Sequence, residues 1–255
     1  MNKKNIIIDG LNVRYYLTDN FDPEKAVVFL HGWGSEAMHF GGMLQKIESA
    51  AALDLPGFGG SEKPKGDWFL EDYVEFVRKF IEQLGIKKPV IAGHSFGGSI
   101  AIRYASEHKD AVDRMILIGS AGIRRKSARK IIFLMLSKTV GLIFRIPGLG
   151  KLRNAARKRF YKAIDSEDYI QSGELSEIYK RIVSEDISKS FPNVTVPTLL
   201  IWGEDDKETP ISDAREMSRS IPGSELEIIK GAGHYVFLDK PEEFERIFFS
   251  FIRKS

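Results

Sequence analysis

The chain has 255 residues, of which 43% are hydrophobic, enough apolar surface to build one large folded domain. It contains no cysteine, which excludes disulfides, thiolate metal sites and a cysteine nucleophile. Its five histidines lack the spacing of a metal site, so we expect neither metal nor cofactor, and the formal net charge of +3 conceals an uneven distribution described below.

Short apolar, β-branched runs recur along the chain, and each predicts a buried strand. They occupy residues 6–8, 26–30, 50–53, 90–92, 115–118, 198–202 and 225–230. The first run ends at Asp9 after three residues, which is too short for the apolar region of a signal peptide. We therefore expect a cytoplasmic protein.

Segments of helical period separate several of these runs. In residues 70–84 the apolar side chains fall on one stripe, and Gly85 ends the pattern. Further helices are predicted near residues 99–107, 213–220 and 241–253. Strands that alternate with helices indicate an α/β protein with a mostly parallel sheet covered on both faces, in which ligands bind beyond the carboxyl ends of the strands.

The alternation stops between residue 123 and about residue 191. The pattern there is helical, with a turn at Pro147 and Gly148, and it contains no convincing strand. We interpret this segment as an insertion.

The motif Gly93-His-Ser95-Phe-Gly97 follows a predicted strand and precedes a predicted helix. This context is typical of a nucleophile elbow, in which a serine occupies a tight, strained turn that leaves no room for side chains two residues away on either side. The helix that follows directs its N-terminal N–H groups toward the reaction centre. We expect Ser95 to be a nucleophile rather than a residue of an ordinary strand-to-helix turn.

A serine nucleophile requires an imidazole to accept its proton and a carboxylate to orient that imidazole. His234 lies in a loop between the last predicted strand and the last predicted helix, where a base could reach the carboxyl edge of the sheet. Three acidic residues, Glu204, Asp205 and Asp206, follow the strand at 198–202. Spacing alone does not separate them.

Together these segments resemble the α/β-hydrolase family over nearly the whole chain outside the insertion. The matching segments are Phe29-Leu-His-Gly-Trp-Gly34, Asp54-Leu-Pro-Gly-Phe-Gly59 with Ser61, Gly93-His-Ser-Phe-Gly-Gly98, Gly203-Glu-Asp-Asp206 with Pro210, and Gly233-His234 with Pro241-Glu-Glu-Phe244.

The resemblance implies an eight-stranded, mostly parallel sheet flanked by helices, with residues 1–120 and 194–255 as the core domain and 121–193 as a helical cap. It implies Asp206 as the catalytic acid, with Asp205 as the second choice. It also implies an oxyanion hole formed by the backbone N–H groups of Trp33 and Phe96. Dehalogenases and epoxide hydrolases of this family have an aspartate where this chain has Ser95, which excludes those activities.

Three other polar residues are interpreted as structural. Asp54 lies in a glycine-rich turn that lacks the Lys and Ser/Thr of a phosphate-binding loop. His31 and His94 are expected to orient their loops rather than transfer protons.

The cap region contains the uneven charge. Residues 121–164 hold thirteen Lys/Arg and no Asp/Glu. We expect this basic face to be solvated or paired with the acidic residues that follow, and weak association with an anionic membrane surface is the alternative. Lys138 and Arg145 interrupt the apolar stretch, which argues against a transmembrane span. The apolar cap residues predict a hydrophobic pocket.

The resulting hypothesis is a serine hydrolase that cleaves short- to medium-chain acyl or aryl esters through an acyl-enzyme on Ser95. A lactonase, a thioesterase or a C–C bond hydrolase would share every residue named above. A slow-turnover ligand-binding protein is the alternative of another class. We expect a small-molecule partner and no nucleic acid, while the sequence does not indicate the oligomeric state.

Overall fold

The computed structural model describes residues 1–124 and 175–254, and the chain divides into two compact units. One unit combines Met1–Ile123 with Glu185–Ser255, and the other is Arg124–Ser184. The sequence predicted the interrupting segment as residues 121–193, so the observed division is narrower at both ends. The turn at Pro147 lies outside the described residues. Within the second unit, the structure describes helix α7, Ser176–Ser184.

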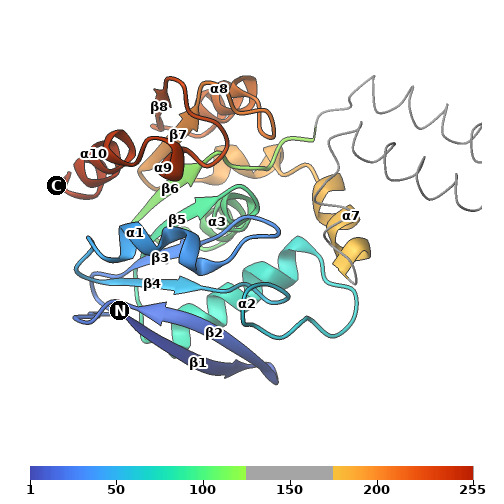
Figure 1. Cartoon of the computed structure of the whole chain (residues 1–255). Coiled ribbons are helices and arrows are strands. Elements are labelled where there is room, and N and C mark those ends of the chain that lie inside the picture. Colours follow the sequence, from blue (N-terminus) through green and yellow to red (C-terminus); the bar gives the residue numbers. More distant parts are fainter. Residues whose placement is uncertain (125–174, 255) are drawn as a thin grey trace, which may run out of the picture. The chain divides into compact units, whose positions relative to one another are not determined.

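The first unit is built on one eight-stranded sheet with the order β1-β2-β4-β3-β5-β6-β7-β8 (Figure 1). Strands β3 to β8 run parallel to one another, whereas β2 runs antiparallel to both of its neighbours, β1 and β4. The predicted mostly parallel sheet is therefore confirmed. The strands are β1 (Asn2–Ile8), β2 (Leu11–Leu17), β3 (Val27–Leu30), β4 (Ala50–Leu53), β5 (Val90–His94), β6 (Arg114–Ile118), β7 (Thr198–Gly203) and β8 (Glu225–Ile229).

Strand β2 is the one strand of this sheet that the residue pattern did not predict. Its apolar residues alternate with Asn12 and Arg14 rather than forming a continuous run. Arg14 is held within the protein by an ion pair between its Nε and Asp54 Oδ2, at 2.5 Å. A charged residue in the middle of a strand thus interrupted the apolar signal.

Helices cover the sheet on both faces. Helices α1 (Gly41–Leu44), α9 (Val236–Asp239) and α10 (Pro241–Ile252) contribute to one core cluster, in which Phe29 packs against Phe40 and Phe248. Helices α2 (Leu70–Gln83) and α3 (Phe96–Glu107) pack against each other, and Phe80 of α2 contacts Tyr15 of β2. Helix α8 (Ile211–Ser220) packs against β7 and β8.

Among the described residues, the short 3₁₀ helices are η1 (Ala37–Phe40) and η3 (Ser188–Asn193). The latter packs against α3 and α8 and so belongs to the sheet-containing unit, although the sequence assigned its residues to the cap.

The predicted helix at 70–84 agrees with α2, whose apolar stripe is buried. Gly85 then adopts a φ of +70°, a conformation that ends a helix at little cost for glycine. The helix predicted from residue 99 begins earlier, at Phe96, directly after Ser95. The carboxyl ends of the parallel strands meet at one edge of the sheet. At that edge β5 leads through Ser95 directly into α3.

Candidate active site

Ser95 forms the whole connection between β5 and α3. Its backbone has φ 50° and ψ −113°, a strained conformation for a residue with a side chain. The turn is anchored on its neighbour strand, because Ser95 N donates to Ile118 O over 3.0 Å and Ala121 N donates to Ser95 O over 3.0 Å.

The two glycines of the motif are required by contact distances. A Cβ on Gly93 would lie 2.4 Å from the carbonyl oxygen of Gly97, and a Cβ on Gly97 would lie 2.1 Å from that of Leu30. Both distances are far below any contact that a protein tolerates. The turn can therefore bring α3 this close to the sheet only with glycine at these positions.

Of the three acidic residues that follow β7, one faces His234. Asp206 is buried, and its Oδ2 lies 2.8 Å from His234 Nδ1, whereas Glu204 and Asp205 are exposed. The geometry thus distinguishes residues that spacing left equivalent.

Asp206 is surrounded by donors. Its Oδ1 accepts hydrogen bonds from the backbone N–H groups of Glu208 and Thr209, both at 2.9 Å, and its Oδ2 lies 2.8 Å from Thr209 Oγ1. Burial alone would raise the pKa of Asp206, but the bonds and charge of His234 and the donors of Thr209 outweigh burial and lower that pKa. The carboxylate is therefore ionised at neutral pH.

An ionised Asp206 accepts, so His234 Nδ1 carries a proton, and in the neutral form of the ring the lone pair is then on Nε2. This Nε2 atom has no hydrogen-bond partner among the described residues. Glu208 Oε2 lies 3.2 Å from it, without the angles of a hydrogen bond. The buried imidazole thus presents a basic nitrogen, which is what a general base requires.

The loops that carry Ser95, Asp206 and His234 lie next to one another. The Ser95 hydroxyl makes no hydrogen bond to His234 in the part of the chain that the structure describes. The ring of His94, the residue before the serine, lies 4.6 Å from the ring of His234 between centroids. A Cβ on Gly119, at the end of β6, would lie 3.2 Å from both His234 Nδ1 and Asp206 Oδ2. The backbone of Ser95 is hydrogen-bonded to Ile118 and Ala121, which lie on either side of Gly119 in the chain.

The residues predicted for the oxyanion hole lie beside Ser95. A Cβ on Gly32, the neighbour of Trp33, would lie 3.2 Å from Ser95 Cβ. Phe96 is the first residue of α3, where a backbone N–H has no acceptor within the helix. The rings of Trp33 and Phe96 pack edge to face at 5.5 Å, and Trp33 also contacts Phe58 at 4.8 Å. These rings form an apolar wall beside the serine.

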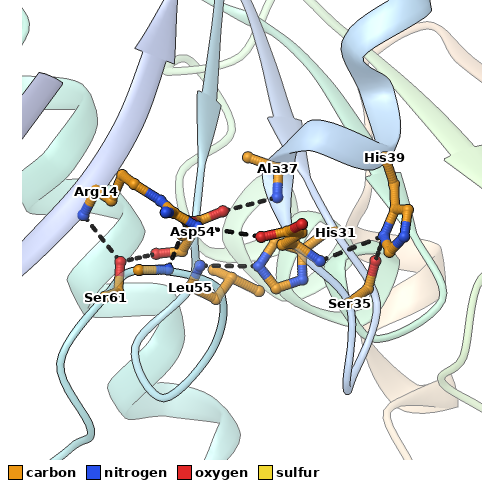
Figure 2. A network of polar contacts seen from close by, with 10 residues as sticks. Arg14, His31, Ser35, Ala37, His39, Asp54, Leu55 and Ser61 are labelled. Atoms are coloured by element: carbon orange, nitrogen blue, oxygen red, sulfur yellow. Dashed lines mark hydrogen bonds and ion pairs between the residues drawn. The ribbon is translucent and has the colours of Figure 1, made fainter. Parts of the chain in front are cut away.

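Asp54 and His31 support the loops around this wall (Figure 2). Asp54 Oδ1 accepts a hydrogen bond from Ala37 N at 2.8 Å, while its Oδ2 pairs with Arg14. His31 Nε2 accepts a hydrogen bond from Leu55 N at 2.9 Å, and Nδ1 lies 2.7 Å from Gly32 O. Burial, opposed in part by the bond to Gly32, lowers the pKa of His31 to about 4, so the ring is neutral.

Several residues near the site were not predicted from the sequence. Thr209 and Glu208 contact Asp206 or His234, and Asp239 Oδ2 accepts a hydrogen bond from Gly233 N at 2.7 Å, next to the base. The threonine had a usable signal, because an aspartate commonly bonds to groups two or three residues ahead in a turn. Glu208 and Asp239 had none.

The expectations about metal binding, membrane spans and the basic segment can be compared with the described residues only. Among those residues there is no group of three or more His, Asp or Glu side chains that could hold a metal ion, and none of their helices is both long and apolar enough to cross a membrane. Apart from Arg124, the thirteen basic residues in the segment 121–164 lie outside the described part of the chain, as does the predicted apolar pocket.

Comparison with known proteins agrees with the fold described above. A model of the alpha/beta hydrolase family matches residues 27–247. The chain is 27% identical over 252 residues to the uncharacterized hydrolase YugF of Bacillus subtilis, and the match covers 92% of each chain.

Two solved structures share the fold at low identity. A bacterial membrane phospholipase A superposes with a TM-score of 0.76 at 24% identity, covering 100% of this chain and 87% of that one. An enol-lactonase from Burkholderia xenovorans superposes with a TM-score of 0.77 at 18% identity, covering 98% and 100%. At these identities the superpositions establish a shared fold.

Proposed function

The chain belongs to the alpha/beta hydrolase family, and from that premise we propose that it is a serine hydrolase with Ser95 as nucleophile, His234 as base and Asp206 as orienting acid. The observation that carries the proposal is the 2.8 Å contact between Asp206 Oδ2 and His234 Nδ1 in a buried setting. A buried carboxylate that orients an imidazole beside a strained serine is the arrangement that activates a hydroxyl.

The reaction follows from which nitrogen bears the proton. His234 Nε2 takes the proton of Ser95 as Oγ attacks the carbonyl carbon of the substrate, and the tetrahedral intermediate forms. Nε2 then gives this proton to the leaving alkoxide, the bond from carbon to that oxygen breaks, and an acyl-enzyme remains. Water attacks the acyl carbon and passes a proton to Nε2, after which Ser95 regains a proton and the acid leaves.

The backbone N–H groups of Trp33 and Phe96 are proposed to stabilise the negative oxygen of the intermediate. Removing one donor of such a pair costs roughly 3–4 kcal/mol in other hydrolases. Because these donors belong to the backbone, their contribution depends on the loop after β3 and on the start of α3 rather than on side-chain identity.

Carboxylic esters with short- to medium-chain acyl or aryl groups are the proposed substrates. The rings of Trp33, Phe58 and Phe96 offer an apolar surface next to the nucleophile, which favours such groups over small polar ones. Lactones are the nearest alternative, because an enol-lactonase has the same fold. Thioesters and C–C bonds could be cleaved with the same three residues.

The test is covalent labelling. A fluorophosphonate probe should label the wild-type protein, and the label should map to Ser95 by mass spectrometry. Ser95→Ala should lose both labelling and hydrolysis, with Ser106→Ala, on the outer part of α3, as the matched control that retains them. Full esterase activity in Ser95→Ala would reject the proposal. A labelled protein that turns over none of a panel of p-nitrophenyl esters, acyl lactones and acyl-CoA thioesters would favour a ligand-binding role.

A further inference from the structure

His94 lies between the proposed nucleophile and the proposed base. It is the last residue of β5, directly before Ser95, and its side chain is 1% exposed. Its Nε2 lies 3.1 Å from the backbone carbonyl oxygen of His234. A carbonyl oxygen only accepts, so the ring must carry its proton on Nε2 and donate it to the residue that supplies the base.

The state of this ring is defined by its surroundings. Burial, followed by the neighbouring His234, keeps the pKa of His94 well below its ordinary value, so the ring is neutral. With the proton on Nε2, the Nδ1 atom is unprotonated, and it has no hydrogen-bond partner among the described residues. A neutral ring of this tautomer can donate to one acceptor, and the carbonyl of His234 is that acceptor.

The ring also has little room to move. Its centroid lies 4.6 Å from the ring of His234, 4.8 Å from Tyr235 and 5.3 Å from Phe237. On the other side, a Cβ placed on Gly32 would come within 3.0 Å of His94 Nδ1. The side chain is thus held between the loop after β3 and the segment that carries the base.

We infer that His94 is a positioning residue, which ties the backbone of His234 to the strand that presents Ser95 and so sets the distance between base and nucleophile. The inference rests on the proposed function. We assign His94 no proton transfer in the reaction, since its Nε2 faces a backbone carbonyl and its Nδ1 is buried with no hydrogen-bond partner among the described residues. Other bonds hold the base to the acid, such as the pair between Asp206 and His234, whereas the His94 bond holds the base to β5.

The consequence is specific to the chemical step. If the bond is lost, the segment of His234 can shift relative to Ser95 while the substrate pocket is unchanged. A displacement of about 1 Å between reacting groups can lower the rate by roughly 10²-fold. The expected effect therefore falls on kcat, with KM nearly unaffected.

Two variants of nearly equal size separate the bond from packing. His94→Gln retains an N–H donor at about the reach of Nε2, and His94→Met fills similar space without a donor. With a p-nitrophenyl ester we expect His94→Met to lose about 10²-fold in kcat and His94→Gln to retain most of it, with similar melting temperatures for the two. Equal kcat values for the two variants, or a loss in His94→Met that disappears after correction for the fraction of labelled Ser95, would overturn the inference.

A measurement independent of turnover completes the test. In protein labelled with ¹⁵N-histidine, NMR should show His94 as the neutral tautomer protonated on Nε2, with the signal assigned by its absence from His94→Gln. A proton on Nδ1 would overturn the bond whatever the activity. If the probe fails to label wild-type Ser95, the proposed function itself falls and the role of His94 with it, whereas labelled, active enzyme with full activity in His94→Met rejects only the role of His94.

Discussion

Thr209 Oγ1 lies 2.8 Å from Asp206 Oδ2, the same carboxylate oxygen that faces His234 Nδ1. The threonine hydroxyl, which also lies 3.4 Å from His234 Nδ1, thus helps to fix the orientation of the acid. The backbone N–H of Thr209 binds the other oxygen, and its carbonyl accepts a 2.7 Å hydrogen bond from Trp202 Nε1, which anchors the turn to β7. The position of the acid is therefore set by residues outside the three proposed to react.

The hydroxyl of Thr209 can be removed with little change in shape. We expect Thr209→Val to raise the pKa of Asp206, to lower the free energy of unfolding by about 1 kcal/mol and to reduce kcat by a modest factor. Thr198→Val is the matched control, because Thr198 is also buried and its Oγ1 donates to a backbone carbonyl away from the site. Equal effects of the two substitutions on kcat would contradict a role for Thr209 in orienting the acid.

Asp206→Asn and Asp205→Asn test the choice of acid. The amide at position 206 can no longer stabilise the imidazolium or impose its tautomer, so we expect a loss of about 10⁴-fold in kcat. Asp205 is exposed, and its substitution should leave kcat near the wild-type value. Steady-state kinetics with one ester decides the matter, and small, equal losses would reject Asp206.

Glu208 places a carboxylate 3.2 Å from His234 Nε2, with its side chain 55% exposed. A carboxylate there attracts a protonated imidazole and so opposes the form that can accept the Ser95 proton. We expect Glu208→Gln to raise kcat/KM by up to about fivefold, since exposed pairs contribute at most about 1 kcal/mol. Steady-state kinetics with one ester compares the variant with the wild type, and an unchanged or lower kcat/KM in Glu208→Gln would contradict this account.

Gly97→Ala tests the steric requirement of the turn. The new Cβ would meet the carbonyl of Leu30 at 2.1 Å, so we expect a loss of at least 1–3 kcal/mol in the free energy of unfolding, typical of overpacking. Activity and probe labelling should be lost as well. Gly42→Ala is the control, because nothing lies within 4 Å of a Cβ at that position. Retained labelling in Gly97→Ala would show that α3 can move away from β3.

His31 predicts a pH-dependent stability. The pKa of His31 is about 4 in the folded protein and 6.5 in the unfolded chain. Between these two pH values the unfolded chain binds a proton that the folded protein does not bind. The stabilising contribution is complete above pH 6.5 and falls by up to about 3 kcal/mol as the pH drops to 4. Urea unfolding of wild type and His31→Gln at pH 7, 5.5 and 4.5 should show the stability difference shrinking across this window. A constant difference would contradict the assignment.

The residue patterns were sufficient for most of the architecture. Seven strands of the sheet were predicted from their residue patterns. Five of them, β3 to β7, are apolar at nearly every position because they are buried on both faces. Strand β2 lacks such a run because Arg14 interrupts it, and the charge of Arg14 is paired with Asp54, forty positions away. A distant partner of this kind leaves no local pattern.

What the sequence by itself determined was the turn of Ser95 and the placement of candidate groups after successive strands, since glycine spacing and strand periodicity are local properties of the chain. Only the tertiary structure decided that Asp206 rather than Asp205 meets His234, and that His94 donates to the carbonyl of His234. The reason is physical: the direction of a loop side chain depends on packing and hydrogen bonds from segments far away in the sequence. Those segments become neighbours only when the sheet is assembled.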